Sequence, residues 1–367
     1  MIMKGEAGMG SVRFYVMTAA MVLTAAASGC VNGTPAETPS AEANSEVQHE
    51  KGMKIETLVP YQANEQTFQM VGGWLKNDTV VFAEYSRGET ILYSYNYTDG
   101  QKNELFKADI AITHFETSSK GDYILLQGSS SPKQTDLLLI DSNGKVRFKK
   151  QFSSHDLAFS WSKTNSDRLF VTTFNEDWSY KTTIYYPLSG SERISPVDAA
   201  FAEWNGDDKL LYMKDGTQSS GSLLYQYDLE RGEEKVLSDG ILAVFSGGRT
   251  WIALKGENGQ LVYAAHKGLK KQQFTGSLIP EDAATNVPKV EINPSGNSFL
   301  SFEYDDKAHQ LNLISYSLDQ EKKSTLLADA KNAPMVFSPD GTKILYGFQL
   351  EKMYNLATGS LKTLIRF

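Results

Sequence analysis

The chain has 367 residues, of which 41% are hydrophobic and 22% are charged. This composition is typical of a water-soluble globular protein and not of a collagen-like, coiled-coil or multi-spanning membrane protein. Lys and Arg total 36 against 44 Asp and Glu, giving a net charge of -8, which argues against nucleic acid as a partner.

The N-terminal segment has the pattern of an export signal. Lys4 and Arg13 precede an apolar or small stretch over residues 14–27, which has the length of a signal-peptide core and is short for a membrane-spanning helix. The stretch ends in Ala27-Ser28-Gly29-Cys30. Small residues before a cysteine suit cleavage between Gly29 and Cys30, after which the Cys30 thiol can carry a diacylglyceryl group.

This segment resembles the lipobox of bacterial lipoproteins, although that family prefers Leu where this chain has Ala27. Cys30 is the only cysteine, so it cannot form a disulfide within one molecule. The alternative is a core cysteine in a buried helix. The resemblance implies that residues 1–29 are a signal peptide and that Cys30 anchors the protein to the extracytoplasmic face of the cell membrane. Acyl chains must supply the membrane affinity, because the acidic chain is not attracted to anionic lipid.

Residues 30–54 form the next segment, which begins with the lipidated Cys30. After that residue the segment is rich in Ala, Glu, Ser, Thr and Pro and contains no aromatic side chain. Such a composition cannot bury enough apolar surface to offset the entropy of ordering. We therefore expect a flexible polar tether.

From residue 55 to residue 367 the chain repeats one pattern, in which a strand, a turn and a second apolar strand are followed by two further strands. Copies of the first strand pair cover residues 70–82, 112–126, 158–170, 201–212, 242–254, 290–300 and 333–346. The apolar residues alternate with period two, and Asp-Gly, Asn-Gly and Thr-Gly pairs supply the positive backbone angles of hairpin turns. No stretch after residue 54 shows a helical period with caps.

Units of four antiparallel strands at this spacing predict a single all-β propeller over residues 55–367. We place seven blades, starting near residues 68, 110, 157, 199, 240, 287 and 333. Six blades stays an alternative because the fifth unit is degenerate. Residues 55–60 have the pattern of a further strand, which is expected to close the ring by pairing with the last blade.

The repeats resemble the WD40-like repeats of TolB-type propellers, whose hallmark is Trp-Ser-Pro-Asp-Gly. Residues 338–341 carry its complete Ser-Pro-Asp-Gly core, Trp161-Ser162 carries its front half, and residues 293–296 are a variant. The succession of lipobox, polar tether and lone propeller also resembles the YqgU-like lipoproteins of Gram-positive bacteria, a group with no assigned activity. Both resemblances predict the architecture and do not indicate a function.

Residues that could carry catalysis are sparse. The five histidines lie in distant segments without zinc-site spacing, and acidic pairs such as Asp207-Asp208 lack the register of a calcium loop. No Gly-x-Ser-x-Gly or phosphate-binding glycine motif occurs. We therefore assign no catalytic residue, metal or cofactor. Two carboxylates from different blades could still form a glycosidase pair.

Five aromatic residues are candidates for a binding face. Trp74, Trp161 and Trp204 occupy equivalent positions near the end of the first strand of their units. They would line one rim of the channel for a sugar or peptide, or would simply pack between blades. Trp178 and Tyr180 differ, because they lie in a polar loop that also contains Glu176 and Asp177. An exposed aromatic in such a loop is the better binding candidate.

These observations favour a membrane-anchored, extracytoplasmic propeller that binds another protein or an envelope component without catalysis. One alternative is an enzyme that acts on a glycan through carboxylates at the channel mouth. Another is a sensor of a small ligand.

Overall fold

The computed structural model describes residues 57–367 except residues 87, 132–133, 217–220 and 280–286. Gly29, Cys30 and the predicted signal peptide and tether lie outside the described residues. Every regular element in the described part is a β-strand, thirty in all, so that part also holds no helix that could cross a membrane.

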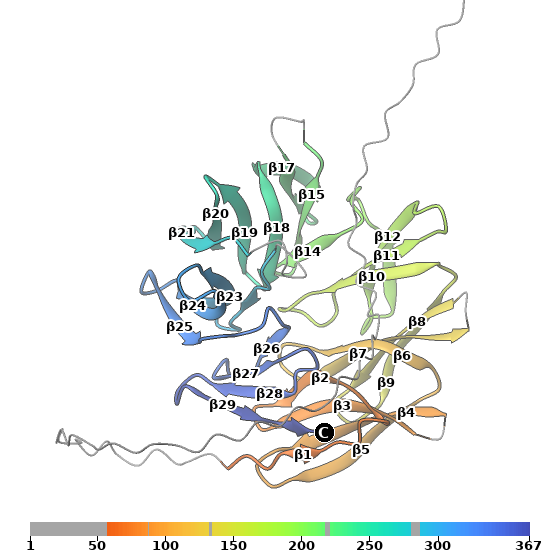
Figure 1. Cartoon of the computed structure of the whole chain (residues 1–367). Helices are drawn as coiled ribbons and strands as arrows, with labels where there is room; N and C mark the ends of the chain where they lie inside the picture. The colour runs from red at the N-terminus through yellow and green to blue at the C-terminus, as the bar shows by residue number, and fades with distance from the viewer. Residues whose placement is uncertain (1–56, 87, 132–133, 217–220, 280–286) are drawn as a thin grey trace, which may run out of the picture. The chain divides into compact units, whose positions relative to one another are not determined.

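Seven four-stranded sheets are arranged in a ring, as Figure 1 shows, and each is a continuous stretch of chain. Cavities lined by residues of the innermost strands mark the central channel of the ring. The first four blades, innermost strand first, are β2 (Phe68–Lys76), β3 (Thr79–Ser86), β4 (Glu89–Asn96) and β5 (Gln101–Ala108); β6 (Ala111–Thr117), β7 (Tyr123–Ser131), β8 (Gln134–Asp141) and β9 (Val146–Phe152); β10 (Asp156–Trp161), β11 (Leu169–Phe174), β12 (Tyr180–Tyr186) and β13 (Ser191–Ile194); and β14 (Ala202–Asn205), β15 (Lys209–Lys214), β16 (Leu223–Asp228) and β17 (Glu233–Ser238).

The last three blades follow the same order. They are β18 (Ile241–Gly247), β19 (Thr250–Glu257), β20 (Gln260–Lys267) and β21 (Lys270–Ser277); β22 (Glu291–Ile292), β23 (Ser298–Asp305), β24 (Gln310–Ser317) and β25 (Lys322–Leu327); and β26 (Met335–Phe337), β27 (Lys343–Tyr346), β28 (Lys352–Asn355) and β29 (Ser360–Thr363). The prediction of an all-β propeller with seven units is confirmed. The fifth unit, which looked degenerate in sequence, has four full strands.

Two ends of the channel can be distinguished because successive strands in a blade are antiparallel. Hairpins between the first and second strands lie at one end, which we call the first-turn end. Hairpins between the second and third strands, and the connections from one blade to the next, lie at the other, which we call the connection end. Glycines with positive φ occur at several hairpins, such as Gly121 (φ 74°) and Gly341 (φ 70°), where an L side chain would be strained.

The ring closes between the first and last blades through side chains and a separate strand pair. The indole N–H of Trp74 in β2 donates to the carbonyl oxygen of Val336 in β26 at 3.0 Å. Two short strands, β1 (Tyr61–Gln62) and β30 (Ile365–Arg366), pair in parallel. The expected N-terminal closing strand is therefore present, but it lies later than residues 55–60 and pairs outside the last blade. That blade already has four strands from the C-terminal part of the chain.

Large apolar side chains fill the spaces between neighbouring blades. Val80 and Phe82 of the first blade are in one cluster with Leu345 and Met353 of the last, and Phe299 and Tyr316 are stacked at 4.4 Å between ring centroids within another. Period-two alternation places one set of residues on each face of a sheet. Because each blade is covered on both faces, both sets are largely apolar.

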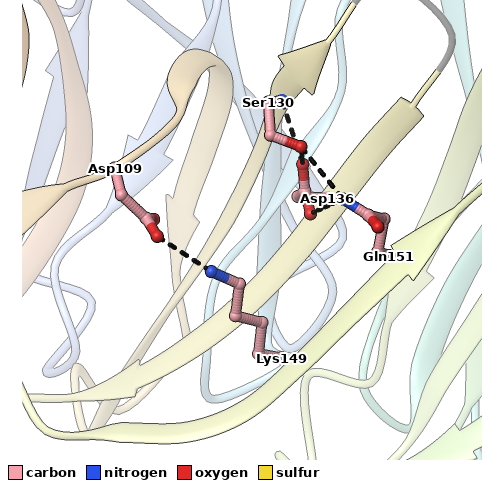
Figure 2. A network of polar contacts seen from close by, with 5 residues as sticks. All are labelled: Asp109, Ser130, Asp136, Lys149 and Gln151. Atoms are coloured by element: carbon pink, nitrogen blue, oxygen red, sulfur yellow. Dashed lines mark hydrogen bonds and ion pairs between the residues drawn. The ribbon is translucent and has the colours of Figure 1, made fainter.

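Figure 2 shows a buried carboxylate in the third strand of the second blade. Asp136 in β8 is only 1% exposed and accepts hydrogen bonds from the backbone N–H and hydroxyl of Ser130 and from the amide of Gln151. Lys149 pairs with Asp109 nearby at 3.0 Å. These contacts satisfy the buried carboxylate and link β8 to β7 and β9. The role of Asp136 is therefore structural.

Candidate functional site

One residue from each innermost strand lies at a common level of the channel. These residues are spaced 43 to 45 positions apart and are Gly73, Glu116, Ser160, Glu203, Ser246, Glu291 and Val336. Hydrogen bonds between blades support the common level, because the Trp74 indole bonds to Val336 and the Trp204 indole donates to the Ser160 carbonyl oxygen. Five consecutive blades thus present an alternation of glutamate and serine.

The five glutamates and serines line one cavity of about 200 Å³, together with Lys163 and apolar residues. Ser160 donates a hydrogen bond to the Glu203 carboxylate at 3.2 Å, and Ser246 donates one to the carbonyl oxygen of Trp204. The serines therefore link adjacent innermost strands. The three glutamates thus line a single cavity.

Lys163 supplies the positive charge of this cavity. It follows β10 in the first-turn hairpin of the third blade, and the Glu116 carboxylate raises its pKa above the ordinary value against the opposing effect of burial. Burial acts to raise the pKa of Glu116, but Lys163 and the neighbouring His114 overcome it and hold that pKa below the usual range. Glu116 and Lys163 thus each stabilise the charged form of the other.

The other two glutamates have the opposite behaviour. Burial raises the pKa of Glu203 to about 7, with Lys163 and the Ser160 hydroxyl opposing the shift. Burial likewise raises the pKa of Glu291 to about 7, again opposed by Lys163. One ammonium group does not compensate three carboxylates in a small cavity. The cavity therefore gains negative charge as pH rises through neutrality.

This shift gives a stability prediction for Glu203→Gln. The folded pKa lies above that of the unfolded chain, so the wild-type protein loses stability as pH rises from about 4.5 to 7. Removing the charge should therefore stabilise the protein at pH 8, by about 1 kcal/mol after screening by channel water, and have little effect at pH 5. Thermal unfolding of the wild type and of Glu203→Gln at pH 5 and pH 8 measures this difference in stability. Glu192→Gln, at an exposed ion pair with Lys150, is the control, and an equal gain there would refute the explanation.

A second, larger cavity opens at the first-turn end. It has a volume of about 610 Å³ and shares Lys163, Ser246, Glu291 and Ile292 with the inner cavity. Its walls are first-turn hairpins, which contribute hydroxyl groups and glycines. Three further cations line it, Lys120, Arg249 and Lys267. The outer cavity is thus basic and the inner one acidic.

The connection end carries an exposed aromatic cluster on the third and fourth blades. Phe174 is buried and its ring contacts the rings of Trp178, Tyr180 and Phe201, with centroids 5.9 to 6.3 Å apart. These three rings are 52%, 40% and 56% exposed. The ring of His155 also contacts Trp178. We call Trp178, Tyr180 and Phe201 the aromatic cluster.

Trp178 stands in the hairpin between β11 and β12 with a backbone φ of 63°, which is uncommon for a bulky residue and costs about 1 kcal/mol. Asp177 supports the turn by accepting hydrogen bonds from the backbone and hydroxyl of Ser179. Tyr180 donates to the Asp198 carboxylate at 3.2 Å. The local contacts thus hold Trp178 and Tyr180 outward.

The other three aromatic residues predicted for a binding face are buried. Trp74, Trp161 and Trp204 are 1%, 6% and 2% exposed, and their indole N–H groups donate to backbone carbonyl oxygens. They pack between blades and do not form an exposed face. Trp74 lines the outer cavity and Trp161 the inner one, whereas Trp178 and Tyr180 are the exposed members of the predicted set.

Sequence reasoning missed the channel residues Glu116, Lys163, Glu203 and Glu291. Each glutamate is isolated in the chain, and only ring closure brings them to one cavity. One signal was available, since Glu203 comes directly before the repeat position of Trp204. Reading that position in every unit gives the glutamate–serine alternation. Among the described residues no group of three or more His, Cys, Asp or Glu could hold a metal ion.

Comparison with known families gives a match over most of the propeller. The model described as "YqgU-like 6-bladed beta propeller domain" matches residues 96–347. That description has six blades, whereas the described residues form seven four-stranded sheets. The uncharacterized lipoprotein YqgU of Bacillus subtilis (strain 168) is 25% identical over 296 residues, which cover 80% of this chain and 83% of the relative.

Solved structures share the fold. An uncharacterized protein of Listeria monocytogenes EGD-e has a TM-score of 0.76 at 20% identity, covering 84% of this chain and 98% of that one. The β-propeller domain of the Trilobed protease from Pyrococcus furiosus, described as having an open velcro topology, has a TM-score of 0.55 at 14% identity over 82% of this chain and 98% of that one. At these identities the similarity concerns the fold alone.

Proposed function

This chain belongs to the YqgU-like family of β-propellers, and we propose that it is a lipid-anchored, extracytoplasmic binding module that holds a protein partner at its connection end without catalysis. Membrane anchoring is supported by the lipobox around Cys30 and by the similarity to a protein named a lipoprotein. The observation that carries the binding role is the aromatic cluster.

Several exposed large apolar residues lie at the connection end, in different blades. They are Tyr85, Trp178, Tyr180, Phe201, Leu242, Leu278 and Phe348, each between 40% and 72% exposed. Three of them form the aromatic cluster, whose rings share the buried contact Phe174. Rigid, partly exposed aromatic side chains contribute most to binding energy at protein interfaces.

Charge defines the partner that suits this cluster. Glu176, Asp177 and Asp198 surround it and are exposed to solvent. A protein segment that combines an apolar anchor with Lys or Arg would fill the aromatic surface and complement these carboxylates. We therefore propose a partner protein with a basic and apolar surface segment.

The test is cross-linking capture from intact membranes followed by reconstitution. Wild-type protein, Trp178→Ala, Phe201→Ala and the control Leu269→Ala are compared, since Leu269 is fully exposed in the hairpin between β20 and β21 at the opposite end. A captured protein supports the proposal only if its purified form binds about tenfold more weakly to Trp178→Ala and Phe201→Ala and unchanged to Leu269→Ala. Equal binding to all four proteins, or capture of glycan alone, would overturn it.

The anchor has its own prediction. Cys30→Ser removes the thiol that accepts the lipid, so the protein should move from the membrane fraction to the soluble fraction, because no other strong membrane affinity is expected from an acidic chain. Immunoblotting of fractions measures the shift. Ser28→Ala, which keeps the cysteine, is the control. Unchanged membrane retention of Cys30→Ser would contradict lipid anchoring.

A glycan-cleaving enzyme is the second candidate, because Glu116, Glu203 and Glu291 line one cavity and two of them have pKa values near 7. A neutral carboxyl group beside an ionised one is the arrangement of acid and base in glycosidases. Release of reducing ends from cell-wall glycan, abolished in Glu203→Gln, would establish this function. No release at pH 6 to 8 would exclude it for that substrate.

A further inference from the structure

At the first-turn end, the channel has a basic outer cavity and an acidic inner cavity. Neither cavity takes part in the proposed binding of a protein at the connection end. The outer cavity of about 610 Å³ and the inner cavity of about 200 Å³ share four lining residues and are therefore adjacent. Cations line the outer part and carboxylates the inner part. Their combined size is that of a small-ligand site.

Two cations of the outer cavity are available for a ligand. Lys120 lies in the hairpin between β6 and β7, and Arg249 in the hairpin between β18 and β19. Neither makes a hydrogen bond or ion pair through its side chain with the described residues. Lys267, in contrast, donates to the Asn297 side chain. Two unpaired cations at one mouth favour an anion with several oxygens, such as phosphate.

Two carboxylates of the inner cavity, Glu203 and Glu291, accept hydrogen bonds from Ser160 and from the Phe337 backbone but make no ion pair with the described residues. Lys163 acts electrostatically on all three glutamates, most strongly on Glu116. Glu203 and Glu291 lie in the fourth and sixth blades, on either side of Ser246 in the fifth. An ammonium group placed there would have three oxygen acceptors around it. Its three N–H donors match that number.

The outer cavity also carries hydroxyl side chains, among them Ser118, Thr250 and Ser295. Such a wall suits a ligand with hydroxyl groups better than an aliphatic one. We propose that the first-turn end of the channel binds a phosphorylated amino sugar, with its phosphate at Lys120 and Arg249 and its ammonium group between Glu203 and Glu291.

Proton release follows from this arrangement. Glu203 and Glu291 both have pKa values of about 7, and Glu116, Lys163 and His114 are the other titratable groups nearby. An ammonium group would stabilise both carboxylates in the charged form. Binding at pH 7 should therefore release about one proton.

Calorimetric titration of the full chain in detergent tests the proposal with glucosamine 6-phosphate as the probe. Glucosamine and glucose 6-phosphate each lack one of the two charges. We expect both to bind about tenfold more weakly than the probe. Titration in buffers with different ionisation enthalpies should show release of about one proton for the probe and none for glucose 6-phosphate.

Variants locate the two ends of the ligand. Arg249→Gln should weaken binding of the probe and of glucose 6-phosphate alike, whereas Glu203→Gln should weaken only the ligands with an ammonium group and reduce proton release. Glu104→Gln, at an exposed ion pair on the outer strand β5, should change neither. Glucose 6-phosphate binding as tightly as the probe, or no heat from the probe at 10 mM, would overturn the proposal, whatever the result for Trp178→Ala.

Discussion

Trp74→Ala should lower the free energy of unfolding by about 4 kcal/mol. Trp74 is 1% exposed, its ring packs edge-on against Tyr97, and its indole N–H bonds to Val336 across the junction between the first and last blades. The substitution leaves a cavity where the ring closes and an unpaired carbonyl oxygen. Urea denaturation followed by circular dichroism measures the change.

Two further variants separate the loss of the hydrogen bond from the loss of the buried ring. Trp74→Phe keeps most of the apolar volume and removes the hydrogen bond, so it should cost about 1 kcal/mol or slightly more. Trp178→Ala removes an equally large ring from an exposed position and should change stability by less than about 1 kcal/mol. Equal midpoints for Trp74→Ala and Trp178→Ala would contradict the place of Trp74 in ring closure.

Gly121→Ala should destabilise the protein by about 3 kcal/mol. Gly121 has a φ of 74°, and a Cβ atom there would lie 2.2 Å from the backbone carbonyl oxygen of Leu75 in the first blade. Positive φ alone costs an alanine about 1 kcal/mol. The remainder comes from moving two packed backbones apart, and the same denaturation experiment measures it.

Gly190 provides the matched control. It has the same φ of 74°, but no atom lies within 4 Å of its added Cβ. Gly190→Ala should therefore cost only the conformational part, about 1 kcal/mol. If Gly121→Ala and Gly190→Ala were equally stable, the first two blades would not be in the close contact described.

The fold could be predicted well from sequence because its signals are local. Period-two apolar strands and turn glycines recur in each unit, and the predicted starts near 68, 110 and 157 lie within one residue of β2, β6 and β10. The N-terminal closing strand was placed too early. Its pairing with β30 depends on two residues only, Tyr61 and Gln62, which is too short to give a periodic pattern.

The candidate sites were predicted unequally. Trp178 and Tyr180 stood out because a polar loop does not need large aromatics, a local property of the sequence. Whether Trp204 packs between blades or lines a surface depends on the neighbouring blade, to which its indole N–H bonds. The inner cavity depends on five blades at once. Its electrostatics could not be derived before the level of each residue in the ring was known.

The pairing of β1 with β30 has a mechanical consequence. Tension along the N-terminal chain is applied first to Val59, whose N–H donates to the Tyr97 carbonyl oxygen, and then to the β1 pairs of Tyr61 with Ile365 and Gln62 with Arg366. The Tyr61 hydroxyl also donates to Glu84 at 2.5 Å and accepts from Lys102 at 2.7 Å. Tension is therefore shared between the first blade and the final strand, and the two chain termini bear any pulling load together.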